Sequence, residues 1–167
     1  MITVYTTLDS PLGELLLVGE ESATAKGGTA LASVSMTTGQ RNAAVVQPGW
    51  IEKAEAFAEV AEQLRAYFAG ESTSFDLEFT AHGTEFQRRV WAALEQVPHG
   101  RTVTYGELAE QAGLPRKSAR AVGTANGSNP LLVIRPCHRV IGADGSLTGY
   151  AGGLERKQQL LELEGRG

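Results

Sequence analysis

Residues 84–127, TEFQRRVWAALEQVPHGRTVTYGELAEQAGLPRKSARAVGTANG, contain the signals that decide the fold of the second half of this chain. Two capping boxes, each a threonine three residues before Gln or Glu, predict helices that begin at Thr84 and Thr104. A tight turn at 113–115 separates the second of these helices from a third, expected over 116–127. Two short helices around a glycine-containing turn are typical of a helix-turn-helix, although ordinary helical hairpins share this spacing.

Apolar residues at helical spacing predict the buried faces of the helices. The helix that begins at Thr84 is expected to bury Phe86, Val90, Trp91 and Leu94. A last helix over 154–164 is expected to bury Leu154, Leu160, Leu161 and Leu163. Between the two, the turn residues 142–145 predict a hairpin, which would place a wing beside the helices.

The first 80 residues have a different pattern, in which strand-like segments surround one helix. Strands are expected at 2–6, 15–18, 30–36 and 75–79, and a helix at 50–68. The sequence therefore predicts an α/β (α+β) protein of two domains. The first, 1–80, is a small α+β domain with a sheet and a helix. The second, 81–167, is helical and winged-helix-like.

The composition is that of an ordinary globular protein. Of the 167 residues, 42% are hydrophobic and 20% are charged. No apolar run approaches the roughly 20 residues of a membrane span, and the first ten residues lack the pattern of a secretory signal. The single cysteine excludes an internal disulfide and a multi-cysteine zinc site. We therefore expect a reducing, cytoplasmic location without membrane contact.

The net charge of −4 is divided unevenly along the chain. Residues 1–80 hold 4 basic and 11 acidic side chains, whereas residues 81–167 hold 11 basic and 8 acidic ones. The segment 111–143 has no acidic residue and five cations: Arg116, Lys117, Arg120, Arg135 and Arg139. Such a basic segment on an acidic protein indicates a polyanionic partner on one face. A solvated charged surface is the competing interpretation.

Cys137 is the residue with the clearest chemical potential. A thiolate is a strong nucleophile, and nearby cations or a hydrogen-bonded base lower the pKa of a thiol. A lone cysteine is more commonly a buried structural residue, but Cys137 lies between Pro136 and His138, with Arg139 next. On a strand, adjacent side chains point to opposite faces, so His138 would reach the sulfur through a water or a bent backbone.

The segment Pro136-Cys137-His138-Arg139-Val140 resembles the active-site signature of the O6-alkylguanine-DNA alkyltransferases, also called methylated-DNA–protein-cysteine methyltransferases. Further blocks are similar to this family and occur in its order: 86–91, 104–109, 119–123, 129–130 and 149–153. The similarity covers 81–165 strongly and 1–80 loosely. It implies an RNase H-like sheet and helix for the N-terminal domain.

For DNA binding, the resemblance implies a helix-turn-helix in the minor groove of double-stranded DNA that contains O6-alkylguanine. The damaged base is flipped out because its alkylated oxygen cannot be reached inside the stack. Arg120 matches the finger that fills the vacated space, and Tyr105 matches the side chain that crowds the rotating phosphate and hydrogen-bonds N3 of the base. Further DNA contacts are expected from Thr104, Lys117, Ser118 and Asn126.

For catalysis, the resemblance implies that Cys137 takes the alkyl group of O6-alkylguanine irreversibly as a thioether. Transfer from O4-alkylthymine is left open. His138, through a water, and Glu164 match the relay that removes the thiol proton, and Asn129 matches the residue that braces the turn before the active-site strand. Backbone groups of Val140, Tyr150 and Ala151 would contact the base. No cofactor or metal is implied, and the protein would be a monomer, with cooperative packing along DNA left open.

Two departures from the family pattern stand out. Arg135 occupies a place where relatives usually have Ile or Val, so we predict that it pairs with an acidic residue or reaches the surface. Ala151 stands where some relatives have Ser, so only its backbone N–H can contribute there. Two other functions compete with alkyl transfer: a module that flips alkylated bases without reaction, which Cys137 weighs against, and a thiol hydrolase.

Overall fold

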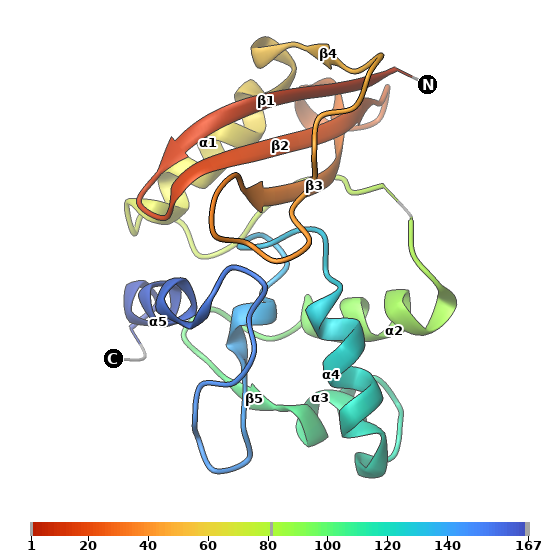
Figure 1. Ribbon diagram of the computed structural model, residues 1–167, viewed down its shortest axis with the longest axis vertical. Helices are drawn as coiled ribbons and strands as arrows, with labels where there is room; N and C mark the ends of the chain where they lie inside the picture. The colour runs from red at the N-terminus through yellow and green to blue at the C-terminus, as the bar shows by residue number, and fades with distance from the viewer. Residues whose placement is uncertain (1, 81, 166–167) are drawn as a thin grey trace. The chain divides into compact units, whose positions relative to one another are not determined.

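A computed structural model describes residues 2–80 and 82–165, which form two compact units, Met1–Thr80 and Ala81–Gly167. The N-terminal unit is a four-stranded sheet of order β3-β2-β1-β4 (Figure 1). β1 (Thr3–Ser10), β2 (Gly13–Glu21) and β3 (Thr29–Met36) are antiparallel neighbours, and the short β4 (Ile51–Glu52) pairs in parallel with β1.

One helix covers one face of this sheet. α1 (Ala58–Phe68) follows a 3₁₀ turn at Ala54–Phe57 and buries Val60, Leu64 and Tyr67 (Figure 1). Apolar side chains of β2 complete the core, since Leu15, Leu16, Leu17 and Val18 are all buried. Side chains on both faces of β2 are therefore buried in its central part, which explains why its sequence is continuously apolar instead of alternating.

The predictions for the N-terminal unit are wrong at two places. The residues expected to begin a helix at Trp50 instead form β4, because Ile51 pairs with Val4 and the N–H of Lys53 donates to Tyr5. The expected strand 75–79 is reduced to an isolated bridge between Phe79 and Leu31. Helical periodicity over three or four residues does not exclude a short strand, so only tertiary pairing decides these segments.

Over residues 82–165, the C-terminal unit is mainly helical (Figure 1). α2 (Glu85–Leu94) and α3 (Tyr105–Gln111) each begin with the predicted capping box, and the hydroxyls of Thr84 and Thr104 accept from the backbone N–H of Gln87 and Glu107. α4 (Ala119–Gly127) follows a 3₁₀ turn at Arg116–Ser118, and α5 (Leu154–Leu163) ends the unit. The helix-turn-helix predicted over 104–127 is confirmed as α3, a turn and α4.

A two-residue parallel ladder links the helix-turn-helix to the segment 136–141, which contains Cys137. β5 (Val103–Thr104) precedes α3 directly, and β6 (Val140–Ile141) follows a 3₁₀ turn at Cys137–Arg139. Val103 pairs with Val140, and Thr104 pairs with Ile141. Because both strands run in the same direction, the start of α3 lies beside the residues that follow β6.

Several expectations for the C-terminal unit need correction. Cys137 and His138 lie on a 3₁₀ turn and not on a strand, so the opposite-face argument does not apply to them. Gly142–Ser146 closes a turn through a backbone hydrogen bond, but within 82–165 no strand returns after it, so the wing hairpin is absent. Phe86, Leu154 and Leu163 are exposed at 37%, 48% and 38%, while Lys157 is fully buried.

No helix among the described residues is both long and apolar enough to span a bilayer.

The capping box of α2 generates a stability prediction. Thr84→Ala removes the hydroxyl that accepts from the N–H of Gln87, which should cost about 1 kcal/mol and lower the melting temperature by roughly 4–8 °C if the unit unfolds as one domain. Thermal unfolding followed by circular dichroism measures this change. Thr84→Ser keeps the cap and serves as the control; an equal loss in both variants would contradict the capping role.

Candidate active site

The only thiol of the chain is buried within the C-terminal unit. Cys137 is 3% exposed, and the amide of Asn126 lies 3.5 Å from its carbonyl oxygen. Burial raises the pKa of the Cys137 thiol to about 11, because a low-polarity surrounding disfavours the thiolate. The neighbouring Asn129 side chain and the positive charge of Lys157 oppose this rise. The thiol is therefore protonated at neutral pH and needs a base before it can act as a nucleophile.

His138 follows Cys137 on the same 3₁₀ turn, and its side chain is held by Glu164. Nε2 of His138 is 2.8 Å from Oε2 of Glu164, and both side chains are almost completely buried. Arg139 donates to the same carboxylate twice, from Nε at 2.8 Å and from Nη2 at 2.9 Å, and a third time to the carbonyl of Val97. The carboxylate is thus ionised and can only accept hydrogen bonds.

This arrangement fixes the tautomer of His138. Since Glu164 only accepts, Nε2 of the ring must be the donor, and the neutral ring then carries its lone pair on Nδ1. Burial lowers the pKa of His138, against the opposing effect of Glu164, so the ring is neutral at pH 7. Nδ1 is buried and has no hydrogen-bond partner within 2–80 and 82–165, which leaves it available to take a proton.

The segment before Cys137 is a tight buried loop with backbone strain. Val133 has a φ of +70°, a left-handed conformation that a β-branched residue rarely adopts. Asn129 holds this loop together, because its amide donates to Arg135 O at 3.0 Å and to Leu131 O at 3.3 Å, while its oxygen accepts from Leu131 N at 3.0 Å. Asn129 therefore braces the loop before Cys137, and this loop leads into a 3₁₀ turn and not into the expected strand.

Tyr105 stands at the first position of α3, where the β5–β6 ladder brings it beside the loop after Ile141. Its hydroxyl lies 3.2 Å from the hydroxyl of Thr148. The ring packs against the backbone of α4 at Gly123, where a Cβ would lie 3.4 Å from Cδ1 of Tyr105. The phenol is half-buried. Its ring is held against α4, and its hydroxyl faces the loop 142–150.

Sequence reasoning missed Lys157, which anchors that loop. Its ammonium group donates to the carbonyls of Val140 and Thr148, both at 2.6 Å, and of Gly149 at 3.3 Å. The signal was present in the sequence, because the spacing of Lys157 from Leu160 and Leu161 places a cation on the buried face of α5. A lysine in an apolar stripe requires buried acceptors, and backbone carbonyls supply them here.

The remaining predicted site residues divide between the surface and the interior. Arg120 and Lys117 are exposed, Ser118 is half-buried, and the hydroxyl of Thr104 caps α3. Asn126 is only 4% exposed and faces Cys137, so it does not lie on the exposed surface of α4 where a DNA contact was expected. The expected base-contacting residues, Val140, Tyr150 and Ala151, are all buried. No group of potential metal ligands gathers within the described part of the chain.

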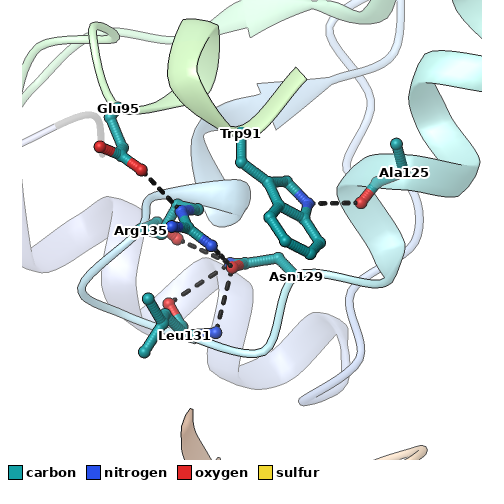
Figure 2. A network of polar contacts seen from close by, with 6 residues as sticks. All are labelled: Trp91, Glu95, Ala125, Asn129, Leu131 and Arg135. Carbon is teal, nitrogen blue, oxygen red and sulfur yellow. Dashed lines mark hydrogen bonds and ion pairs between the residues drawn. The ribbon is translucent and has the colours of Figure 1, made fainter. Parts of the chain in front are cut away.

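The acidic partner of Arg135 is Glu95 (Figure 2). Nε of Arg135 lies 2.8 Å from Oε2 of Glu95, and the arginine side chain is 8% exposed while that of the glutamate is 35% exposed. The prediction that this unusual cation pairs with an acidic residue is confirmed.

Comparisons with known proteins agree over both units. Residues 3–81 match the ribonuclease-like domain of 6-O-methylguanine DNA methyltransferase, and residues 85–166 match the DNA-binding domain of the same family. A methylated-DNA–protein-cysteine methyltransferase of Mycolicibacterium paratuberculosis is 54% identical over 97% of this chain and 92% of that protein. One of Methanosarcina acetivorans is 49% identical over 96% and 97%.

A solved structure shows the same similarity. The crystal structure of Mycobacterium tuberculosis OGT in complex with DNA is 50% identical in sequence, with a TM-score of 0.85 over 96% of this chain and 92% of that one. With both domain models matched and near-complete relatives at about half identity, this chain belongs to the 6-O-methylguanine DNA methyltransferase family.

Proposed function

We propose that this protein repairs O6-alkylguanine in double-stranded DNA by moving the alkyl group onto Cys137, once per molecule. The observation that carries the proposal is the buried Cys137 thiol on the same 3₁₀ turn as His138, whose pairing with Glu164 leaves a proton acceptor free on the ring. The similar proteins from Mycolicibacterium paratuberculosis and Methanosarcina acetivorans are named for methyl transfer from DNA to a protein cysteine. A nucleophilic thiol can perform this chemistry.

The proton of the thiol passes to Nδ1 of His138 through one bridging water. Glu164 stabilises the imidazolium that forms, because its carboxylate already accepts from Nε2 at 2.8 Å. Arg139 keeps Glu164 ionised and correctly oriented through its two hydrogen bonds. Burial of the thiol makes this relay necessary, since very little thiolate exists at neutral pH without it.

In the transfer step, Cys137 Sγ attacks the alkyl carbon from the side opposite the oxygen. The S–C bond forms as the C–O6 bond breaks, and the electron pair of that bond stays on guanine. Tyr105 donates a hydrogen bond to N3, so guanine leaves as a nearly neutral species. In net terms, the proton of the thiol ends on guanine and the protein keeps an inert thioether, which is why no cofactor is consumed and no second turnover follows.

The helix-turn-helix would bind the duplex in the minor groove and flip the base. Arg120, exposed on α4, fills the vacated space in the stack, while Lys117 and Ser118 near the start of that helix and Thr104 at the start of α3 contact the backbone. Support comes from the similar protein of Mycobacterium tuberculosis, OGT, which was crystallised in complex with DNA. Asn126 is better assigned to the interior, where it faces the backbone of Cys137.

The flipped base would be held by backbone groups of Val140, Tyr150 and Ala151, in the region that Lys157 anchors. A single thiol nucleophile acts alone, so a monomer is sufficient for the chemistry, and cooperative packing along DNA would be an additional property. A reducing compartment such as the cytoplasm suits the reaction, because Cys137 must remain a thiol.

The relay predicts an unusual pH dependence. Transfer from a methylated duplex should have a constant rate between about pH 7 and 9, because the neutral thiol and neutral His138 are both the prevailing forms there. At acidic pH, below the ordinary pKa range of an imidazole, the rate should fall as His138 gains a proton. Quenched-flow measurement of methyl transfer tests this; a rise of about tenfold per pH unit up to about pH 9 would show direct attack by thiolate formed in solution and would contradict the relay.

Substitution of the nucleophile separates binding from chemistry. Cys137→Ala should abolish methyl transfer completely and retain selective binding of a duplex that contains O6-methylguanine, since the helix-turn-helix is unchanged. Binding is measured by fluorescence anisotropy and transfer by analysis of the DNA. Cys137→Ser is the matched control that restores a polar atom at the position; transfer in either variant would remove Cys137 from the mechanism.

Arg120→Ala tests the flipping step. Transfer from duplex DNA should slow about tenfold, corresponding to roughly 1.4 kcal/mol of lost stabilisation of the flipped state, whereas transfer from free O6-methylguanine base should be unchanged. Arg41→Ala, which removes an exposed cation of the N-terminal unit, controls for the change in charge. An equal loss on both substrates would mean that Arg120 acts on the pocket and not on the stack.

A further inference from the structure

A polar neighbour of the Tyr105 hydroxyl, the side chain of Thr148, has no role in the mechanism proposed above. The two hydroxyl oxygens lie 3.2 Å apart, and the carbonyl oxygen of Thr148 lies 3.5 Å from the phenol oxygen. Tyr105 begins α3, whereas Thr148 belongs to the loop 142–150 that follows β6. The contact therefore joins the helix-turn-helix to the loop that leads to Tyr150, one of the residues proposed to hold the flipped base.

Neighbouring groups hold both partners of this contact in place. The ammonium group of Lys157 donates to the Thr148 carbonyl at 2.6 Å and to the adjacent Gly149 carbonyl at 3.3 Å. Lys157 is fully buried, so this anchor is shielded from water. On the other side, the ring of Tyr105 packs against α4 at Gly123. The two hydroxyls are thus kept close by contacts other than their own hydrogen bond.

The same ammonium group limits the competition for the phenol proton. A carbonyl oxygen can only accept, so a phenol that donated to the Thr148 carbonyl would hold its proton away from a bound base. That carbonyl already accepts from Lys157 at 2.6 Å, and its 3.5 Å distance from the phenol oxygen is long for a hydrogen bond. The Thr148 hydroxyl is therefore the closer and less occupied partner of Tyr105.

A hydroxyl differs from a carbonyl because it can reverse its role. The threonine O–H rotates about its C–O bond, so it either accepts from the phenol or donates to it. Once N3 of a flipped guanine accepts the phenol proton, the Thr148 hydroxyl can turn and donate to the phenol oxygen. The resulting chain of hydrogen bonds, from threonine through tyrosine to N3, strengthens the donor that stabilises the leaving guanine.

We propose that Thr148 is a positioning residue, whose hydroxyl directs the proton of the Tyr105 phenol toward N3 of the flipped base and strengthens that hydrogen bond. The inference rests on the proposed function in taking Tyr105 as the donor to N3. Lys157 contributes indirectly, since it holds the backbone of Thr148 and occupies its carbonyl. Loss of the threonine hydroxyl should therefore matter only where both the phenol and N3 are present.

Two other roles for this contact predict different results. If Thr148 were a latch that kept the phenol away from the base, its loss would speed transfer. A latch requires the two groups to separate, which the anchors on both sides oppose. If Thr148 instead contacted the DNA directly, its loss would slow transfer whether or not Tyr105 has a hydroxyl.

The test removes the two hydroxyls of the full-length protein separately and together. Thr148→Val deletes the threonine hydroxyl with nearly the same side-chain shape, Thr148→Ser retains it, and Tyr105→Phe deletes the phenol hydroxyl. Single-turnover methyl transfer is measured from a duplex that contains O6-methylguanine and from the same duplex with the 3-deaza analogue, which has C–H in place of N3. Thr37→Val, which removes an exposed hydroxyl 3.0 Å from Glu14 in the N-terminal unit, is the matched control.

We expect Thr148→Val to slow transfer from O6-methylguanine about three- to tenfold, the effect of one lost hydrogen bond, and Thr148→Ser and Thr37→Val to keep the native rate. In the Tyr105→Phe background, or on the 3-deaza duplex, Thr148→Val should have no further effect. A merely structural role would slow transfer in those two settings as well. Faster transfer, equal slowing in every setting, or an unchanged rate would each overturn the proposal, in favour of a latch, a direct DNA contact or no role.

Equilibrium binding separates failure of this inference from failure of the proposed function. In the Cys137→Ala background, which has no nucleophile, fluorescence anisotropy measures the affinity for each duplex. Thr148→Val should weaken binding of the O6-methylguanine duplex about threefold and leave binding of the 3-deaza duplex unchanged. If this pattern is found but the native protein transfers no methyl group, the role of Thr148 stands and the repair assignment fails. Normal transfer with rates and affinities indifferent to Thr148→Val would refute the inference and leave the repair assignment intact.

Discussion

The buried carboxylate of Glu164 is the interaction on which the rest of the site depends. It accepts one hydrogen bond from His138 and two from Arg139, so it joins the end of α5 to the turn that carries Cys137. Because an arginine-bound carboxylate cannot donate, it also decides which nitrogen of His138 is free. Removal of this one group would leave Arg139 buried without its partner, at a cost of several kcal/mol, and would release the tautomer of the histidine.

Burial and reactivity oppose each other at Cys137, and the surrounding structure resolves the conflict. A buried thiol with a pKa of about 11 is protected from oxidation and from electrophiles in solution. It becomes a nucleophile only where a base lies ready and the alkyl group is brought to the sulfur. Lys157 keeps the neighbouring loop in place through three backbone carbonyls, and the β5–β6 ladder keeps Tyr105 beside that loop. Such a site favours a substrate that the protein itself positions at the sulfur over electrophiles that diffuse in solution.

The capping boxes were reliable signals, whereas features that depend on contacts between distant residues could not be predicted from the sequence. The capping boxes at Thr84 and Thr104 act over three residues, so the starts of α2 and α3 were predicted correctly. The need of Arg135 for an acidic partner was predictable from the cost of a buried charge, but its identity was not, because Glu95 is 40 residues away along the chain. The 3₁₀ turn at Cys137 and the strand at Ile51 depend on tertiary pairing that periodicity does not contain. Glu164 was identified only through the family resemblance, since a glutamate at the end of a helix is ordinarily a solvated residue.

The central claim is that Cys137 receives the alkyl group from guanine in DNA, and mass spectrometry of the reacted protein tests it most directly. After incubation with a duplex that carries O6-methylguanine, the account predicts one methyl group per protein molecule on the peptide that contains Cys137, together with restored guanine in the DNA. Tight and selective binding without a methyl adduct, or a methyl group on any other residue, would contradict it.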